Sequence, residues 1–363
     1  MPIEREKKYL IDENQATKLK NMAKFSIGVV QWYLPDCILL LELLGERDFS
    51  KSREWRIRYT VDKKGNETWI AAFKSELVEG FQRVEEEYDL TKFIRKQNTD
   101  MWERLFNELS SKPVVVKIRH YISDTPTEIV LDEFMQLDIP YNIDIKYMVE
   151  IETEDEFEKY EKEYDLGEGI STEEFDIYTN RNIAIESQIP PRVLITLVKQ
   201  ALGISPFPKM RRKDRELPIR DAIELLKIGE YGFFTTYDGN YPYAVPVNYV
   251  YKDGAIYFHC ASSGKKLENI SVHKNVSFSV VTKAKVLPEQ LSTAYESVIA
   301  FGQARVVDGE KKKMALLELV RKYSPQTYGK FTQSRAEEFE SECSNTTVVK
   351  LIIEYITGKR RNE

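Results

Sequence analysis

The sequence predicts a mainly β protein with helices, an α+β chain whose two domains are antiparallel β-barrels. The chain has 363 residues, which exceeds one typical domain and is enough to bury two substantial cores. Its first half contains short strand candidates with charges at alternate positions, and its second half contains a helix followed by strands that tight turns connect. The predicted division is a first domain at 1–185, a linker at 186–208 and a second domain at 209–363.

The first strand candidate places several charges on one face. In Glu4-Arg5-Glu6-Lys7-Lys8, the side chains of Glu4, Glu6 and Lys8 project from the same side because strand side chains alternate. Solvated edge strands often carry such triplets, so the pattern becomes informative through repetition. Six later segments repeat it, at residues 56–58, 74, 83–87, 117–119, 128–132 and 150–152.

Apolar residues alternate with these charges. Ile57, Ile118 and Ile151 must pack against other elements while the charged faces converge elsewhere. Strands with an apolar outer face and a charged inner face predict a closed, eight-stranded antiparallel barrel with a polar lumen. A barrel of that size can hold one small ligand.

The predicted lumen combines cations with carboxylates. Its seven cations, which suit a polyanion, are Lys8, Arg56, Arg58, Lys74, Arg83, Lys117 and Arg119. Carboxylates in a lumen are tolerated only when they pair with the bases or bind hard cations such as magnesium or manganese. Carboxylates, a divalent metal and a cationic clamp are the parts of phosphoryl transfer.

Residues 1 to about 185 resemble the CYTH domain, the triphosphate tunnel metalloenzyme family, whose signature is Glu-x-Glu-x-Lys in the first strand. The opening PIEREKKYLID, the segment QWYL and the charged strands follow in the family's order. The resemblance implies that the seven cations clamp a triphosphate and that Glu4, Glu6 and Lys8 take part in catalysis. It also implies that Mg²⁺ or Mn²⁺ is held by Glu4, Glu6, Asp132, Glu150 and Glu152.

The resemblance leaves the reaction of this domain open. Members of the family cleave a triphosphate, free or within a nucleotide or thiamine ester, and cyclisation of ATP would use the same clamp. The sequence departs from the family at Ala72, where Thr is common, and in the long apolar stretch CILLLELLGERDFSKS. A domain that senses a polyphosphate or nucleotide without turnover, and regulates the second domain, is the alternative.

Around Thr179 the charged β pattern ends, and residues 190–209 contain a predicted helix. The sequence RVLITLVKQALG is apolar at helical spacing, and Gly203, Pro206 and Pro208 end the helix. We interpret this segment as a packed linker helix rather than a flexible tether.

The second half predicts a helix at 218–228 followed by an antiparallel barrel. Asp238-Gly239-Asn240 and Lys252-Asp253-Gly254 are typical hairpin turns. A later strand ends before the turn Ser262-Ser263-Gly264-Lys265-Lys266, which leads into another helix. Such a turn presents backbone N–H groups, a helix dipole and cations to one anion, as a phosphate monoester requires, although Ser-Gly-Lys also forms ordinary capped turns.

Residues 209 to 363 resemble the nitroimidazole-resistance (Nim) type of the pyridoxamine 5'-phosphate oxidase-like split-barrel family. The motifs are RRKDR, EYGFFTTYDGNYPYAVPVNYVY, IYFHCASSGKKLENI, VIAFGQARVV and IIEYITGK. The resemblance implies an FMN-binding split β-barrel that forms a homodimer through this domain, with FMN at the interface. It places Lys265 and Lys266 on the FMN phosphate. The other flavin contacts it implies are Val245, Pro246, Val247, Asn248, His259, Cys260 and, more weakly, Ser297.

His259 is a candidate proton donor, or a hydrogen-bonded structural residue, at the end of a strand. The favoured activity is an FMN-dependent, nitroreductase-like oxidoreductase with a small substrate and an electron donor. True pyridoxamine phosphate oxidation is disfavoured, because a second phosphate needs basic residues beyond those assigned to FMN. A domain that only sequesters FMN is a further alternative.

Several classes of protein are not expected. The three cysteines, at 37, 260 and 343, have no metal spacing and an odd count, which favours a reducing cytoplasm. We expect no membrane segment, because the most apolar run is short and contains Glu42. The net charge of −6 and the acidic residues beside Arg211-Arg212-Lys213 argue against nucleic-acid binding. The amphipathic segments at 311–323 and 335–341 are expected to face the core or the dimer.

Overall fold

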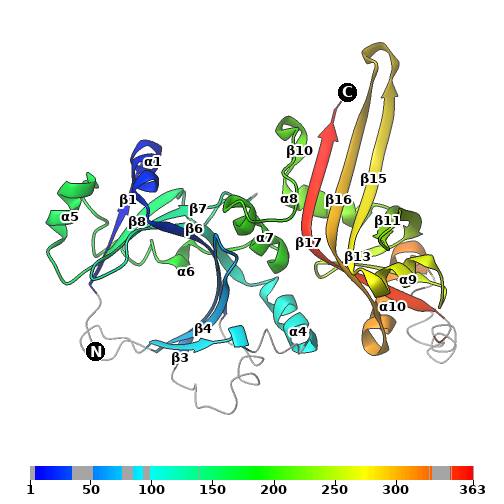
Figure 1. Ribbon diagram of the computed structural model, residues 1–363, viewed down its shortest axis with the longest axis horizontal. Helices are drawn as coiled ribbons and strands as arrows, with labels where there is room; N and C mark the ends of the chain where they lie inside the picture. Colours follow the sequence, from blue (N-terminus) through cyan, green and yellow to red (C-terminus); the bar gives the residue numbers. More distant parts are fainter. Residues whose placement is uncertain are drawn as a thin grey trace. The chain divides into compact units, whose positions relative to one another are not determined.

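A computed structural model describes residues 5–34, 52–75, 85–92, 99–137, 139–326, 328, 344 and 346–362. For residues 52–54, 73–75, 85–86 and 99–100 it describes the backbone only. The chain divides into two compact units, Met1–Phe207 and Pro208–Glu363, called unit 1 and unit 2 (Figure 1). Each unit is built on one antiparallel sheet, so the prediction of a mainly β protein with helices is confirmed.

Unit 1 contains a strongly curled sheet (Figure 1). Its strands run in the order β1-β8-β7-β6-β2-β3-β4-β5, and β9 pairs with β6. Within the described residues β1 and β5 are the two ends of this order, so the closed tunnel stays a prediction. The strands are β1 (Glu6–Leu10), β2 (Phe25–Leu34), β3 (Ser52–Asp62), β4 (Glu67–Ser75), β5 (Glu85–Asp89), β6 (Pro113–Ser123), β7 (Glu128–Phe134), β8 (Tyr147–Glu152) and β9 (Ile185–Glu186).

The strand register places the charged positions of neighbouring strands on a common face. Glu152 on β8 lies opposite Glu6 on β1 and also opposite Glu128 on β7. Arg119 on β6 lies opposite Asp132 on β7 in the same way. Because directly opposite residues share a face of the sheet, the alternation in sequence becomes a charged concave surface.

The other face of the sheet is apolar and covered by helices. The helices of unit 1 are α1 (Glu13–Met22), α4 (Thr99–Leu109), α5 (Phe157–Tyr164), α6 (Asn180–Ile183) and α7 (Pro191–Ala201). Helix α1 begins at a capping box in which Asp12 accepts from the Gln15 backbone. Tyr9, Leu131 and Ile151 are fully buried in one cluster beneath α1 and α5. This apolar packing holds the charged strands in place.

The predicted linker helix corresponds to α7, which packs on β2, β3 and β6 of unit 1. A Cβ atom at Gly28 on β2 would lie 2.7 Å from the Cβ of Val198 on α7. Only glycine therefore allows this close approach of helix and strand. Val193, Leu194 and Val198 are buried, so α7 contributes to the core of unit 1.

Unit 2 contains a second antiparallel sheet, with the strand order β12-β11-β15-β16-β17-β14-β13, and β10 pairs with β17. The split barrel that we expected stays a prediction. The strands are β10 (Glu216–Leu217), β11 (Tyr231–Tyr237), β12 (Pro242–Asn248), β13 (Val250–Lys252), β14 (Ala255–Cys260), β15 (Asn275–Leu287), β16 (Ser292–Val307) and β17 (Thr347–Arg361). The helices are the 3₁₀ turns η1 (Lys213–Arg215) and η2 (Pro288–Gln290), and α8 (Ile219–Ile228), α9 (Lys265–Val272) and α10 (Gly309–Tyr323).

Local sequence signals in unit 2 are confirmed. The predicted helix at 218–228 is α8, and the predicted helix at 311–323 lies within α10, whereas the segment 335–341 lies outside the described residues. The β13–β14 turn has positive φ at Asp253 and Gly254, as its Asp-Gly sequence predicts. The hairpin of β15 and β16 extends well beyond the rest of the sheet (Figure 1). None of the helices in the described part of the chain is long and apolar enough to cross a membrane.

Candidate functional site

A cavity of about 750 Å³ lies on the charged concave face of unit 1. Side chains from all eight strands β1 to β8 line it, together with side chains of the segment 175–182. Cations and carboxylates occur in its described lining in equal numbers. The cations are Lys8, Arg56, Arg58, Lys117, Arg119 and Arg181, and the carboxylates are Glu6, Glu87, Glu128, Glu150, Glu152 and Asp176. A polyanion can therefore bind only by displacing or outcompeting some of these internal ion pairs.

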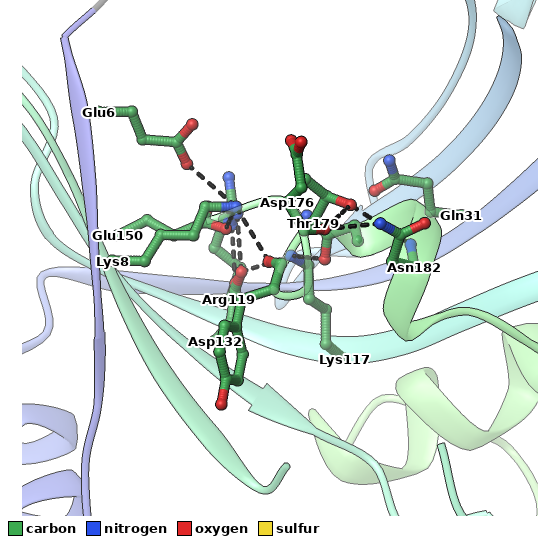
Figure 2. Close-up of polar contacts among 12 residues, drawn as sticks. Glu6, Lys8, Gln31, Lys117, Arg119, Asp132, Glu150, Asp176, Thr179 and Asn182 are labelled. Atoms are coloured by element: carbon green, nitrogen blue, oxygen red, sulfur yellow. Dashed lines mark hydrogen bonds and ion pairs between the residues drawn. The ribbon is translucent and has the colours of Figure 1, made fainter. Parts of the chain in front are cut away.

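Lys117 and Arg119 of the cavity lining belong to a buried ion network centred on Asp132 (Figure 2). Asp132 is fully buried and accepts hydrogen bonds from Arg119 Nε at 2.8 Å and Arg119 Nη2 at 2.7 Å. Lys117, whose side chain is 1% exposed, contacts the same carboxylate and donates to Asn180 Oδ1 at 2.9 Å. Burial lowers the pKa of Lys117 although Asp132 opposes this effect. Both Asp132 oxygens are thus occupied by cations.

Lys8 lies between two carboxylates in the same cavity (Figure 2). Its Nζ is 3.5 Å from Glu6 and 3.4 Å from Glu150, and it donates to the Tyr178 carbonyl at 3.2 Å. Burial and the nearby charge of Glu150 raise the pKa of Glu6, and Lys8 only partly offsets them. Burial alone would lower the pKa of Lys8, but Glu150 and Glu6 outweigh it and raise the pKa.

Two arginines of β3 crowd positive charge at another wall of the cavity. The Nη2 atoms of Arg56 and Arg58 lie 3.4 Å and 3.1 Å from the same oxygen of Glu87. Burial lowers the pKa of Arg58, and the neighbouring Arg56 lowers it further. The buried Nε of Arg58 has no hydrogen-bond partner among the described residues. An anionic ligand would satisfy this donor and reduce the repulsion between the arginines.

A segment that we did not identify from the sequence closes part of the cavity. Phe175, Asp176, Thr179, Asn180 and Asn182 line it after the last long strand of unit 1 (Figure 2). The segment is attached to the sheet through the bonds from Lys8 and Lys117. Thr179 also forms the N-cap of α6 by accepting from the Asn182 backbone. The polar run from Thr179 to Asn182 was the available signal in the sequence, but its spacing does not follow a strand.

The described residues do not assemble the expected metal site. Among them, no group of three or more His, Cys, Asp or Glu side chains could hold a metal ion. Asp132 and Glu150 instead form ion pairs with Lys117, Arg119 and Lys8. Glu6 and Glu152 lie on the cavity wall, and Glu4 lies outside the described residues. The predicted site for Mg²⁺ or Mn²⁺ therefore stays a prediction, and we derive no step that uses a metal.

The structure brings five of the seven predicted clamp cations to this one cavity, namely Lys8, Arg56, Arg58, Lys117 and Arg119. The side chain of Lys74 and all of Arg83 lie outside the described residues. What the sequence could not show is that Asp132, Glu150 and Glu87 already neutralise most of these cations.

In unit 2, the predicted flavin residues fall into two nearby groups and one distant residue. His259 is exposed and Cys260 is half-buried at the end of β14, directly before the turn that leads into α9. Burial raises the pKa of the Cys260 thiol, although Lys266 opposes it. Lys265 forms a 2.5 Å ion pair with Asp238 in the β11–β12 turn.

The second group is on β12, which also approaches β14. Val245, Pro246, Val247 and Asn248 pair only with β11 among the described strands, so β12 is an edge of the sheet. Ser297 lies apart from both groups, in the middle of β16 between Val281 and Lys359.

The turn before α9 fits a phosphate group. Gly264 has φ +133° and no atom within 4 Å of the position that a Cβ would occupy, so the turn is open. Ser262 and Ser263 are exposed beside it, and Lys265 and Lys266 follow at the start of the helix. Backbone N–H groups at a helix start and two cations suit an anion. Binding would require Lys265 to exchange Asp238 for the ligand.

Comparison with known proteins finds a family match for residues 219–360. Residues 219–360 match the family described as pyridoxamine 5'-phosphate oxidase. Similar solved structures include a protein assigned to 5-nitroimidazole antibiotic resistance from Bacteroides thetaiotaomicron (21% identity, 41% of this chain and 84% of that chain, TM-score 0.33). They also include FAD-binding proteins from Mesorhizobium loti (20%, 41% and 98%, TM-score 0.32) and Mycobacterium smegmatis (25%, 41% and 98%, TM-score 0.29).

No curated protein sequence matches the chain. All three TM-scores are below 0.5, so we base no conclusion on these structures. The family match does not extend into unit 1, and the resemblance of that unit to CYTH domains finds no support in these comparisons. Residues 219–360 are therefore a region of the pyridoxamine 5'-phosphate oxidase-like family.

Proposed function

We propose that unit 2 binds FMN and acts as a flavin-dependent oxidoreductase on a small substrate. The observation that carries this proposal is the family match over residues 219–360, within which the open Ser-Ser-Gly-Lys turn precedes α9. FMN, when bound, supplies hydride transfer. The chain's own residues would bind and orient it.

Different residues of unit 2 would hold the phosphate and the ring system of FMN. Lys265, Lys266 and the first N–H groups of α9 hold the phosphate, and the backbone of Val245 to Asn248 contacts the ring system at the edge strand β12. His259 is exposed at the end of β14, where it can exchange a proton with a substrate. The electron donor and the substrate would approach from the exposed side of this turn.

We also propose that unit 2 forms a homodimer. Tyr231 and Phe233 on β11, Val281 on β15 and Ile299 on β16 are exposed apolar side chains. Phe233 and Ile299 lie opposite the same residue, Ser279, so the four residues share one face of the sheet. A sheet face with several exposed apolar side chains is typical of an interface, and a second copy of the chain is the occupant we propose.

The flavin proposal predicts that the purified protein is yellow and that this colour depends on the turn before α9. Lys265→Gln combined with Lys266→Gln should lower FMN affinity by about 100-fold, because two charge-assisted hydrogen bonds to the phosphate are lost. Affinity would be measured by quenching of FMN fluorescence. Lys283→Gln, which changes an exposed lysine on β15, is the matched control and should leave affinity unchanged. A folded, colourless protein that does not rebind FMN would contradict the proposal.

We further propose that the cavity of unit 1 binds an oligophosphate, the ligand class that the CYTH resemblance implies. The unpartnered, buried Nε of Arg58 beside Arg56 favours an anion. A linear oligophosphate could replace Glu87 as the partner of both arginines and reach Lys8 or Lys117 deeper in the cavity. Because the described carboxylates do not assemble a metal site, the proposal covers binding, as in a polyphosphate sensor, and not turnover.

This second proposal predicts that inorganic tripolyphosphate binds unit 1 and that Arg58→Gln weakens binding by about 20-fold. Isothermal titration calorimetry would measure the affinity of the full chain. Lys24→Gln, at an exposed ion pair outside the cavity, should have no effect. A background with both Lys265→Gln and Lys266→Gln weakens any binding at the turn before α9. Equal affinity of wild type and Arg58→Gln in that background would refute the proposal.

A further inference from the structure

A third group of cations lies on unit 2, apart from the cavity of unit 1 and from the turn before α9. It adjoins the apolar face proposed above for the homodimer, because Ser297 lies opposite Val281. We define the Tyr295 cluster as Arg215, Tyr295, Ser297 and Lys359. Ser297 on β16 lies opposite Lys359 on β17, and Tyr295 lies two residues before Ser297, so these three side chains share one face. That face is turned away from α8, because the adjacent Gly358 approaches Ala222 of α8 on the other side.

Arg215 reaches the cluster from a different part of the chain. It ends η1 directly before β10, whose Glu216 pairs with Lys359. Its Nη1 donates to the Tyr295 hydroxyl at 3.5 Å. The Nζ of Lys359 lies 5.8 Å from the centroid of the Tyr295 ring. Two cations from separate elements thus meet at one phenol.

The pKa of the Tyr295 hydroxyl reflects the two cations beside it. Burial acts to raise its pKa, but hydrogen bonds from Arg215 and Lys359, together with their charges, outweigh burial and lower the pKa. The lowered pKa therefore agrees with the geometry, in which both cations lie close to the phenol oxygen or ring of Tyr295.

The two carboxylates beside the cluster, Asp214 and Glu216, have their shortest contacts with cations outside it. Asp214 forms two hydrogen bonds with Arg212, at 2.7 Å and 2.5 Å, and lies 3.8 Å from Arg215. Glu216 forms a 2.5 Å ion pair with Lys213. In the part of the chain that the structure describes, no carboxylate forms an ion pair with Lys359. Lys359 and one side of the Arg215 guanidinium are therefore available to an anion.

We propose that the Tyr295 cluster binds the phosphate or carboxylate group of a small molecule. The planar guanidinium of Arg215 and the ammonium of Lys359 supply charged donors, and the hydroxyls of Tyr295 and Ser297 supply neutral ones. This set matches an oxyanion with several acceptor oxygens. The site is independent of the proposed flavin site, because it uses β16, β17 and η1 and none of the residues at the start of α9. Ser297 thereby belongs to a different site from the one that the family resemblance implied.

The test is a titration of the full chain with inorganic phosphate, followed by NMR of tyrosine labelled with ¹³C at Cζ. The chain has 21 tyrosines, and the signal of Tyr295 is identified by its absence in Tyr295→Phe. Phosphate should shift this signal in a saturable way and raise the pKa of Tyr295, because a bound anion offsets the two cations. Arg215→Gln and Lys359→Gln should each weaken phosphate binding by about tenfold. Lys283→Gln, a lysine of the same hairpin outside the cluster, should leave binding unchanged.

Substitutions at the other two sites show whether phosphate binds the Tyr295 cluster itself. A shift that persists in Lys265→Gln and Arg58→Gln supports the Tyr295 cluster even if FMN or tripolyphosphate binding fails. Parallel titration with acetate distinguishes the ligand class, since a carboxylate site responds to acetate and a phosphate site does not. Absence of a saturable shift with either anion, or an equal shift in Lys359→Gln, would overturn the proposal.

Discussion

Asp132→Asn is expected to destabilise unit 1 by roughly 3–5 kcal/mol, the usual cost of removing one partner of a buried ion network. The substitution keeps the size of the side chain but removes its charge. Lys117 would remain in the buried network without a carboxylate partner, and Arg119 would keep only its ion pairs with glutamates. The new amide N–H group would also face the N–H donors of both cations.

Tryptophan fluorescence during urea unfolding would measure this effect. All four tryptophans, Trp32, Trp55, Trp69 and Trp102, belong to unit 1, so the signal reports that unit alone. Asp124→Asn is the matched control, because its ion pair with Lys24 is about half exposed and should contribute less than about 1 kcal/mol. If Lys117→Met is added to Asp132→Asn, part of the stability should return. Equal midpoints for Asp132→Asn and Asp124→Asn would show that the buried network does not stabilise the sheet.

Gly302→Ala is expected to destabilise the centre of unit 2 by about 3 kcal/mol or more. The new Cβ would lie 1.8 Å from the carbonyl oxygen of Ile352 on β17, at a β-bulge in the β16–β17 pairing. A backbone atom within a sheet cannot move aside as a flexible side chain can. The two longest strands of the unit would have to separate locally or shift their register.

Hydrogen exchange followed by mass spectrometry would detect this change. Peptides from β16 and β17 should exchange about two orders of magnitude faster in Gly302→Ala than in wild type. Gln303→Ala alters the exposed neighbour on the same strand and should change exchange little. Unchanged protection in Gly302→Ala would mean that the bulge accommodates a methyl group.

The sequence was sufficient to predict the parts of the fold that depend on local pattern. Charges at alternate positions around Arg58, Arg119 and Glu150 correctly identified strands, and Asp253-Gly254 identified a turn, because each depends on a few adjacent residues. The helix periodicity at 218–228 identified α8 for the same reason.

Other features depend on which strands become neighbours. The alternating pattern predicted that Arg119 and Glu150 lie on a common face of the sheet. It could not predict that the two side chains form an ion pair with each other. The pairing of Lys265 with Asp238 joins residues on different elements, and spacing carries no information about it. The segment at 175–182 was missed because its residues line the cavity from an irregular stretch and a single helical turn. These features follow from tertiary contacts, which single-sequence periodicity cannot specify.

The contact between Gly28 and α7 has a consequence for how this chain can be divided. Val198 occupies the space that a side chain at position 28 would need, so β2 and α7 fit each other closely. The two elements must therefore stay in the same folding unit. A gene rearrangement that separated them at residue 185 would leave a groove on β2 and an apolar helix without its partner. A break at the boundary between the two units, after Phe207, would leave this complementarity intact. The natural boundary for exchanging either half with another protein is therefore beyond α7, not before it.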